Sequence, residues 1–279
     1  MTGAPSSVVS VRMSAATVWD LIGALRDLAA GARLYSLWLR LGWLDVKLKY
    51  RRTYLGPFWV TASFGLSAIA MTIVFGKLFA IPTQQFIPYL ISGLAIWTLL
   101  SSLILDGCGS YIGSMGLILQ FRLPLSVHVY RQLTRNLILF GHNLLVAELA
   151  SLYFGTDYGW ATLLMLPALA LIVLNGVWVS ILLGTICTRF RDLPPLVALL
   201  VNITFFVTPI FWKKEMLAER GFIADFNPLF HFIEILRAPL LGQMPPIQSW
   251  YAVTFMTVIG WVATLAVYAL YRRRIAYWL

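Results

Sequence analysis

Charged side chains are scarce in this chain: Asp, Glu, Lys and Arg together make up 11% of its 279 residues. A soluble domain of this length needs far more charge to cover its surface. The acidic residues are the scarcer kind, with 11 against 21 basic residues, giving a net charge of +10. The basic residues flank apolar runs instead of forming a solvated domain. We therefore expect them to contact anionic lipid headgroups, and we do not expect nucleic acid as a partner.

Side chains suited to chemistry are also few. The two cysteines, Cys108 and Cys187, match no metal or redox spacing, and the three histidines are too scattered for a metal site. Gly76-Lys77 is followed by Leu78, so the backbone cradle and the hydroxyl of a phosphate-binding loop are both missing. The sequence therefore predicts no catalytic, cofactor-binding or metal site, and any uphill work must draw its energy from a partner or an ion gradient.

Apolar residues make up 60% of the chain, and its mean hydropathy is +0.81. They gather into runs long enough to cross a bilayer, which takes about 20 residues. The pattern predicts an all-α membrane protein with a cytosolic tail at residues 1–32 and one transmembrane domain at 33–279. Its six predicted spans cover residues 57–80, 86–105, 133–154, 160–186, 196–212 and 250–271.

Glycine and proline mark several boundaries. Gly56-Pro57 opens the first span, the glycine-rich stretch 107–116 is expected to stop the second, and Pro209 is expected to kink the fifth. Residues 226–241 are apolar, with Pro228 near their start, but too few to cross a bilayer. We expect a short helix there, dipping into the outer leaflet before the last span.

The distribution of basic residues predicts the orientation. Of the 21 Lys and Arg residues, 16 fall on the side of the membrane that holds both termini. The positive-inside rule places that side in the cytosol. We therefore expect a multi-pass protein of a bacterial inner membrane with both termini cytosolic.

Residues 33–50 have the pattern of an amphipathic helix lying in the membrane interface. Its apolar face is formed by Leu34, Leu37, Trp38, Leu41, Leu44 and Leu48, and its basic edge by Arg33, Arg40 and Lys47. Two interpretations stay open, a membrane anchor and a contact surface for a partner.

Two cytosolic loops are candidates for partner contact. Residues 117–135 mix apolar and basic side chains around Pro124, which suits docking into a groove on another protein, although a re-entrant turn that only links two spans has the same pattern. The short loop at 187–195 is basic, with Asp192 available to pair with Arg189 or Arg191.

Several short motifs occur in a specific order: YRRTYLGPFW at 50–59, LPLS at 123–126, RNLI at 135–138, the pair His142-Asn143, RFRD at 189–192, PIFW at 209–212, NPL at 227–229 and RAPL at 237–240. This series resembles the ABC-2-type permeases of polysaccharide exporters, the membrane subunits that export O-antigen, capsule, teichoic acid and related glycans. The resemblance runs from residue 33 to the C-terminus, and the first 32 residues resemble nothing known.

The resemblance implies a homodimer that binds two copies of a separate nucleotide-binding subunit, which would hold ATP and Mg, with no cofactor in this chain. It also implies that residues 117–131 are the main coupling helix, that 189–194 are a second contact, and that the amphipathic helix lies beside the ATPase. The coupling residues would be Arg122, Leu123, Pro124, Leu125, Ser126, Arg189, Arg191 and Asp192, and the interface helix would present Arg33, Trp38, Arg40 and Lys47.

In exporters of this kind spans one and five line the path, and aromatic rings suit sugars. The candidates for lining that path are Phe64, Phe75 and Phe79 on span one and Asn202, Phe205 and Trp212 on span five. Packing or lipid contact would give the same stripes. Glu148, inside the third span, is a functional candidate because an acid is costly in lipid, unless a Ser or Asn of a neighbouring span pairs with it.

Together these features predict the permease half of an ATP-driven exporter of a lipid-linked polysaccharide. One alternative is an ABC-2 exporter of a smaller amphiphile, such as a drug or a lipo-oligosaccharide. Another is an intramembrane enzyme acting on polyprenyl-phosphate sugars. That enzyme would need clustered Asp, His and Arg at one membrane face, and the loops offer no such set.

Overall fold

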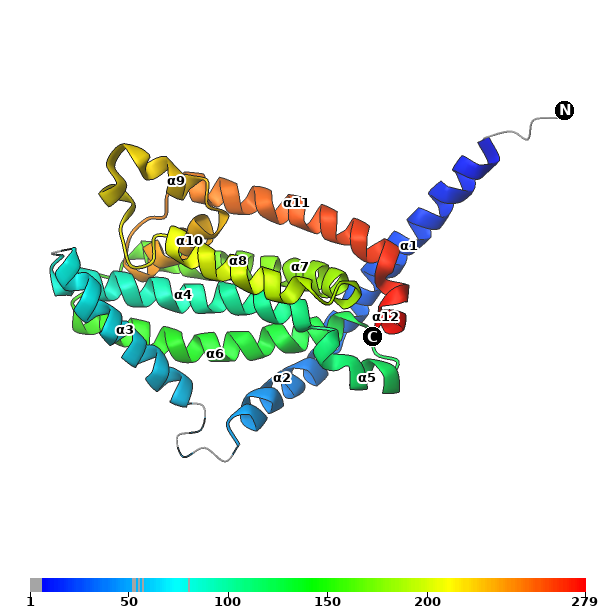
Figure 1. The fold of residues 1–279 in the computed structure, drawn as a ribbon, viewed down its shortest axis with the longest axis horizontal. Helices are drawn as coiled ribbons and strands as arrows, with labels where there is room; N and C mark the ends of the chain where they lie inside the picture. The colour runs from blue at the N-terminus through cyan, green and yellow to red at the C-terminus, as the bar shows by residue number, and fades with distance from the viewer. Residues whose placement is uncertain (1–6, 52–53, 55, 57, 80) are drawn as a thin grey trace.

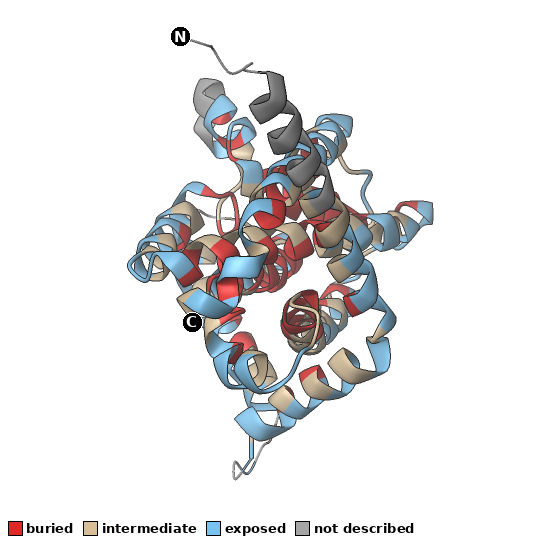
Figure 2. Cartoon of the chain, turned by 90° about the vertical axis from the view of Figure 1, so that its right-hand side faces the viewer, coloured by how far each residue is buried: buried red, intermediate tan, exposed pale blue. Residues whose placement is uncertain are grey.

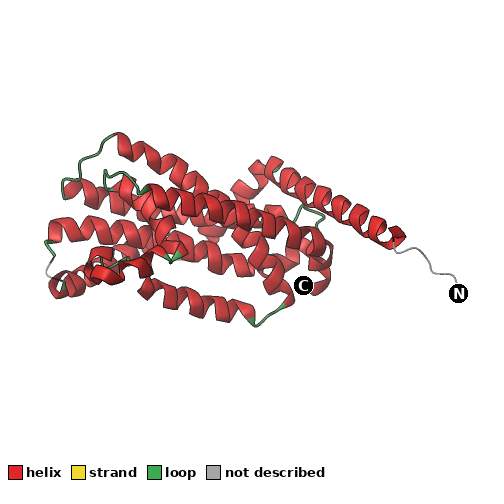
Figure 3. Cartoon of the chain, turned by 90° about the horizontal axis from the view of Figure 1, so that it is seen from above, coloured by secondary structure: helices red, strands yellow, loops and turns green. Residues whose placement is uncertain are grey.

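A computed structural model describes residues 7–279 apart from 52–53, 55, 57 and 80, with side chains undescribed at 7–19 and 217–220. Every regular element in these residues is a helix (Figure 3). The α-helices are α1 (Ser7–Arg33), α2 (Tyr35–Lys49), α3 (Phe58–Leu78), α4 (Thr83–Gly109), α5 (Met115–Gln120), α6 (Ser126–Tyr153), α7 (Met165–Arg189), α8 (Leu193–Val207), α9 (Phe222–Asp225), α10 (Pro228–Leu240), α11 (Ile247–Tyr271) and α12 (Ile275–Trp278). Short 3-10 turns connect some of them: η1 (Ile112–Ser114), η2 (Trp160–Leu164), η3 (Lys214–Gly221) and η4 (Arg272–Arg274).

Five helices of the described chain are long and apolar enough to cross a membrane: α3, α4, α6, η2 continued by α7, and α11. They coincide with five of the six predicted spans and confirm an all-helical, multi-pass membrane protein. The remaining predicted span, 196–212, corresponds to α8, an apolar helix of 15 residues. At 1.5 Å per residue α8 is about 22 Å long, which is less than the roughly 30 Å of a hydrocarbon core.

The predicted kink at Pro209 is wrong, because α8 ends before that residue. Its last helical residue is Val207, and Thr208 is already extended, with φ −87° and ψ 133°. The proline ring disfavours a helical conformation in the residue that precedes it. Pro209 therefore ends α8 and does not bend it.

The glycine-rich stretch 107–116 ends the second span, as predicted, although the helix runs a few residues past the predicted bound of 105. Helix α4 continues through Gly107 to Gly109 before η1 begins. A Cβ added at Gly107 would lie 3.0 Å from the Cα of Ser180 on α7. Glycine here allows α4 and α7 to approach closely.

Most of the predicted cytosolic tail at 1–32 is helical: α1 begins at Ser7, and residues 1–6 lie outside the described residues. Helix α1 contacts α6 and α11, and Ala24 is fully buried. A Cβ added at Gly31 would meet the Oγ of Ser126. Because small residues make these contacts, the sequence shows no broad apolar stripe to predict them.

Helix α2 lies where the amphipathic helix is predicted, but its packed face is only partly the predicted one. Gly42 and Val46 are buried against α6, whereas Leu44 and Leu48 are exposed. A Cβ at Gly42 would lie 2.8 Å from the backbone oxygen of Arg131. The small residue therefore sets the line along which α2 meets α6.

The long helices form a bundle with α4 at its centre (Figure 1). In the most apolar stretch of α4, 67% of the residues are buried within the chain, whereas in that of α3 only 11% are. Seen along the bundle, the buried residues lie on the inward surfaces of the helices (Figure 2). Helices α1, α5 and α12 lie at one end, called here the basic end, and α9 lies at the opposite end (Figure 1).

The apolar stretch predicted as a short helix before the last span is α10. Its first residue is Pro228, and the side chain of Asn227 accepts a hydrogen bond from the backbone N–H of Leu229 at 3.0 Å, which caps the helix. From Phe230 to Leu240 every residue except Glu234 is buried. Helix α10 packs against α4, α7 and α11, so most of its surface faces protein.

Candidate functional site

The predicted main coupling residues form a bend between α5 and α6 at the basic end. Arg122 is exposed, and Leu123, Pro124 and Leu125 are half-buried. Ser126 is buried as the first residue of α6. The segment thus offers a charged, partly apolar surface on one side and is tied to the bundle on the other.

Asp27 of α1 provides that tie, because it caps the N-terminus of α6 from a different helix. Its carboxylate accepts hydrogen bonds from the backbone N–H groups of Leu125 at 3.0 Å and Ser126 at 3.1 Å, and from the Tyr268 hydroxyl at 2.8 Å. The Ser126 hydroxyl in turn donates to the backbone oxygen of Asp27 at 2.8 Å. Anionic groups stabilise helix N-termini. The sequence gives no signal for Asp27, since the capping residue lies about a hundred positions from the helix that it caps.

The second predicted contact, 189–192, is arranged differently from the expectation. The Arg189 guanidinium lies 5.4 Å from the ring centroid of Phe190 and 5.2 Å from that of Trp278. Arg191 donates to the backbone oxygen of Trp278 at 3.2 Å. Among the described residues Asp192 forms no ion pair, so the expected pairing with Arg189 or Arg191 is not found.

Helix α12 connects the two predicted coupling segments. It contacts α5 on one side and α7 on the other, and Trp278 supplies the ring beneath Arg189. Sequence reasoning missed this element. Its signal is an aromatic side chain that follows the basic run Arg272–Arg274 at the end of the chain.

An ion pair holds the predicted interface helix α2 to α6. Asp45 of α2 accepts from Arg131 of α6 through Nε at 2.7 Å and Nη2 at 2.5 Å. One turn further along α6, Arg135 donates to Asp106 of α4 at 2.8 Å, which joins α6 to α4. The Trp38 ring lies 5.7 Å from that of Tyr130. The predicted basic edge is exposed: Arg33, Arg40 and Lys47. Sequence reasoning missed Asp45 and Asp106. The only signal for them is that two arginines one helical turn apart, Arg131 and Arg135, need acidic partners.

The candidate path residues of spans one and five meet in an aromatic cluster. Phe75 of α3 stacks on Phe79 with centroids 5.9 Å apart and on Phe211 at 4.7 Å. Phe211 lies 5.7 Å from Phe205 of α8, which lies 5.4 Å from Trp97 of α4. The structure therefore brings the two predicted faces together through Phe211 and Trp97, neither of which was a candidate.

Three other path candidates lie outside that cluster of ring contacts. Phe64 is buried and makes no ring contact with a described residue. Asn202 is exposed on α8. Trp212 is half-buried, and its indole N–H donates to the backbone oxygen of Phe206 at 3.3 Å.

Glu148 has a partner from the loop that follows its own helix. The hydroxyl of Tyr158 donates to its carboxylate at 2.7 Å. Burial, and then the bond to Glu148, raises the pKa of Tyr158 to about 12. The partner is thus a tyrosine, not the Ser or Asn that the sequence suggested.

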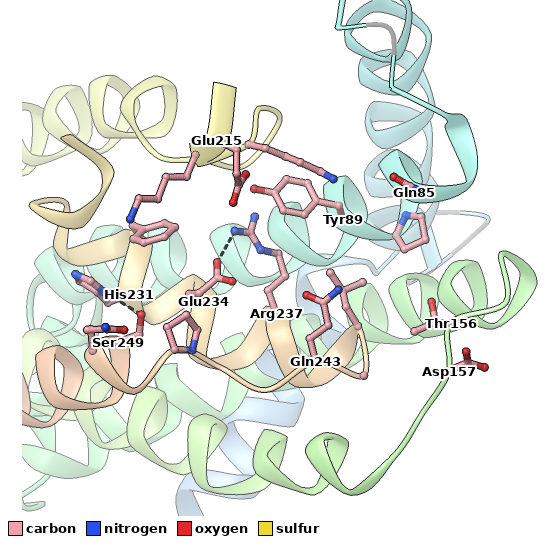
Figure 4. A pocket seen from close by; sticks show the side chains of 18 of the residues that line it. Gln85, Tyr89, Thr156, Asp157, Glu215, His231, Glu234, Arg237, Gln243 and Ser249 are labelled. Carbon is pink, nitrogen blue, oxygen red and sulfur yellow. Dashed lines mark hydrogen bonds and ion pairs between the residues drawn. The ribbon is translucent and has the colours of Figure 1, made fainter. Parts of the chain in front are cut away.

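A cavity of about 1240 Å³ opens at the end opposite the basic end (Figure 4). Its walls are the first turns of α4 and α11, the loop after α6, η3 and α10. We call it the Arg237 pocket after the residue at its floor. Among the described residues, no group of three or more His, Cys, Asp or Glu side chains is placed to hold a metal ion there or elsewhere.

The floor of the Arg237 pocket is a fixed polar network. Arg237 is 2% exposed and donates to the Glu234 carboxylate at 2.6 Å and to the backbone oxygen of Pro209 at 2.7 Å. Its guanidinium lies 4.0 Å from the ring centroid of Tyr89. The Tyr89 hydroxyl donates to the backbone oxygen of Trp212 at 3.1 Å. The floor is therefore tied to the segment that directly follows α8.

The rim is held by further polar contacts. The His231 ring contacts Ser249 Oγ through Nδ1 at 3.0 Å and the backbone oxygen of Asp225 through Nε2 at 2.8 Å. Lys214 donates to the Asp225 carboxylate at 2.7 Å. These bonds join η3, α9, α10 and α11 around the opening (Figure 4).

The bundle of long apolar helices is that of a multi-pass membrane protein. The ABC-2 type transporter family matches residues 37–241, and the chain belongs to that family. It is a transport component and not an ATPase.

The most informative relatives are permeases of O-antigen export. The O-antigen export system permease protein RfbA of Klebsiella pneumoniae is 23% identical over 235 residues, which covers 82% of this chain and 88% of the relative. A second RfbA from Klebsiella pneumoniae is 26% identical over 196 residues, covering 68% and 74%. RfbA of Myxococcus xanthus is 25% identical over 235 residues, covering 79% and 86%. The chain is thus the permease of an ABC-2 exporter that is homologous to O-antigen export permeases.

Proposed function

We propose that this permease moves a lipid-linked polysaccharide out of the cytosol of a bacterium, driven by a separate ATPase. The observation that carries the proposal is the similarity to three O-antigen export permeases along most of both chains. The aromatic cluster that joins α3 and α8 supports it, because ring faces suit sugars.

The assembly that we propose is a homodimer with two copies of the ATPase, with ATP and Mg bound by the ATPase. The surfaces of α3 and α8 support the homodimer, because both helices leave large apolar side chains exposed. These include Leu66, Ile69 and Ile73 on α3 and Leu199, Ile203 and Phe206 on α8. In the proposed homodimer a second protomer would cover part of this apolar surface, and lipid would cover the rest.

The topology that we propose has six crossings with both termini in the cytosol. Helix α8 supplies about 22 Å of the fifth crossing. In this proposal the segment 208–212, which follows α8 and begins with the extended Thr208, supplies the rest. The exposed basic edge of α2 then faces the cytosolic headgroups and the ATPase.

Coupling would use the two segments at the basic end. Movement of the ATPase would press on the 121–125 bend and on the 189–192 loop. Asp27 passes force from the bend to α1 and α11, and α12 links the bend to α7. The charged residues of these segments therefore transmit force and do not touch the glycan.

The test is deletion of the chain in its host, followed by complementation. The expected result is that surface polysaccharide disappears, that lipid-linked polymer accumulates inside the cell, and that the wild-type chain restores export. Normal surface polysaccharide in the deletion strain would contradict the proposal. Loss of resistance to a small amphiphile, with polysaccharide unchanged, would favour export of a smaller amphiphile instead.

A further inference from the structure

We propose that the Arg237 pocket binds a segment of uncharged, hydroxyl-rich glycan at the exit of the path. The inference rests on the proposed function and assigns a second glycan site, at the opposite end of the bundle from the coupling segments. Three properties of the pocket support it: its size, the chemistry of its free side chains and its position beside α8.

The size of the pocket suits a piece of polymer. Pockets for single small molecules typically enclose about 300–1,000 Å³. The Arg237 pocket encloses about 1240 Å³ and is open on one side. It therefore has room for several linked sugars, with the polymer continuing through the opening.

The free side chains of the lining match sugar hydroxyls. Amide side chains project from three separate elements, at Gln84 and Gln85 of α4, at Gln243 after α10 and at Gln248 of α11. All four are exposed, and none forms a side-chain hydrogen bond within the described part of the chain. An amide both donates and accepts, as a hydroxyl does, so each can pair with a sugar in either sense. The half-buried ring of Phe154 adds an aromatic face to the same lining.

The charges of the pocket argue against an anionic ligand. Arg237 is already bound by Glu234, and Lys214 by Asp225. The carboxylates of Glu215 and Asp157 also line the cavity, and neither forms an ion pair with a described residue. A phosphate or a polyanion would meet these free carboxylates, and among the described residues that line the pocket Lys213 is the one Lys or Arg without a carboxylate partner. An uncharged glycan meets no such repulsion.

The position of the pocket connects it to the path. Trp212 is the last path candidate of the α8 segment, and Lys213 and Lys214 follow it directly as pocket lining. The Tyr89 hydroxyl bonds the backbone of Trp212 and so joins the two regions. A chain of sugars leaving the aromatic cluster therefore reaches the pocket next.

The experiment measures binding of the host's own polysaccharide, released from its lipid by mild acid and labelled at one end. Fluorescence polarisation gives its affinity for the purified permease. The double variant Gln85→Ala/Gln243→Ala removes two amides from opposite walls (Figure 4). We expect about tenfold weaker binding, as for the loss of two modest hydrogen bonds. Gln120→Ala is the matched control, since Gln120 is an exposed glutamine on α5.

The outcomes separate this inference from the proposed function. Equal affinity of the wild type and the double variant, or no binding by the wild type, overturns the pocket assignment. Displacement of the glycan by inorganic pyrophosphate overturns the uncharged ligand class. The affinity comparison and the pyrophosphate competition use only variants whose thermal unfolding matches the wild type.

The deletion experiment above tests export separately. If export depends on the chain but the double variant binds glycan as tightly as the wild type, the pocket assignment is refuted and the proposed function is not.

Discussion

Removing the Asp27 carboxylate should loosen the coupling bend by a predictable amount. Asp27→Ala deletes the acceptor of two backbone N–H groups and of the Tyr268 hydroxyl. Loss of a helix N-cap costs about 0.5–2 kcal/mol, and a further hydrogen bond adds about 1 kcal/mol. We expect a total loss of about 1.5–3 kcal/mol. Asp27→Asn keeps one side-chain acceptor and should cost about half as much.

The matched control for Asp27 lies on the same helix. Asp20 pairs with Arg273 at 3.1 Å, and the Arg273 side chain is 70% exposed. Exposed ion pairs contribute about 0–1 kcal/mol. Asp20→Asn removes the same charge from α1 and should therefore change stability little.

The chain carries its own probe for the measurement. Cys108 and Cys187 are buried and free, so a thiol-reactive fluorophore reports unfolding as they become accessible. A loss of 1 kcal/mol shifts the unfolding temperature of a protein of 150–250 residues by about 2–4 °C. Asp27→Ala should therefore unfold roughly 3–12 °C below the wild type. Equal shifts for Asp27→Ala and Asp20→Asn would refute the capping role.

The remaining predictions concern the other contacts. Trp278→Ala removes the ring beneath Arg189 and should lower export severalfold per folded permease in a cell-surface polysaccharide assay, whereas the exposed Tyr277→Ala should not. Asp45→Asn should lower stability by about 1.5–3 kcal/mol in the thiol assay because Arg131 loses a charged partner, and no measurable change would contradict that. Phe75→Leu keeps an apolar side chain but loses two stacked contacts, so export should slow while stability falls by less than about 3 kcal/mol. Destabilised protein with normal export per folded molecule would assign Phe75 to packing. Reporter fusions after the C-terminus should report the cytosol, and a signal from the outer face would contradict the orientation.

The spans could be predicted because crossing a bilayer needs a long apolar run, and such runs are visible in composition alone. Their ends were harder, since local contacts decide them. The glycine-rich stretch marks the end of α4 correctly, but only to within a few residues, because Gly107 still lies inside the helix. Pro209 is predicted to kink a helix, but Thr208 turns extended before it. There the residue before proline decides where the helix ends.

In the candidate site, too, the sequence shows the segments but not the contacts between distant residues. The predicted coupling bend lies between two spans and Arg122 is exposed on it, while its coupling role stays a prediction. Its support could not be predicted, because Asp27 and Tyr268 meet it across distances in sequence of about a hundred residues or more. The Arg237 pocket was missed for the same reason, since its amides come from helix starts and loops far apart in the chain.

The uneven burial of the long helices gives the molecule two mechanical parts. Helix α4 is enclosed by its neighbours, whereas α3 touches the rest of the chain along one narrow strip that includes Phe64 and Ala68. Inside a bilayer the surface that a displaced helix uncovers meets lipid, so the cost of displacement is the packing contacts that are lost. Helix α3 buries few residues within its own chain, so a shift of α3 against α4 and α6 would break few such contacts. Since α3 also carries Phe75, such a shift would open and close the aromatic cluster without unfolding any helix.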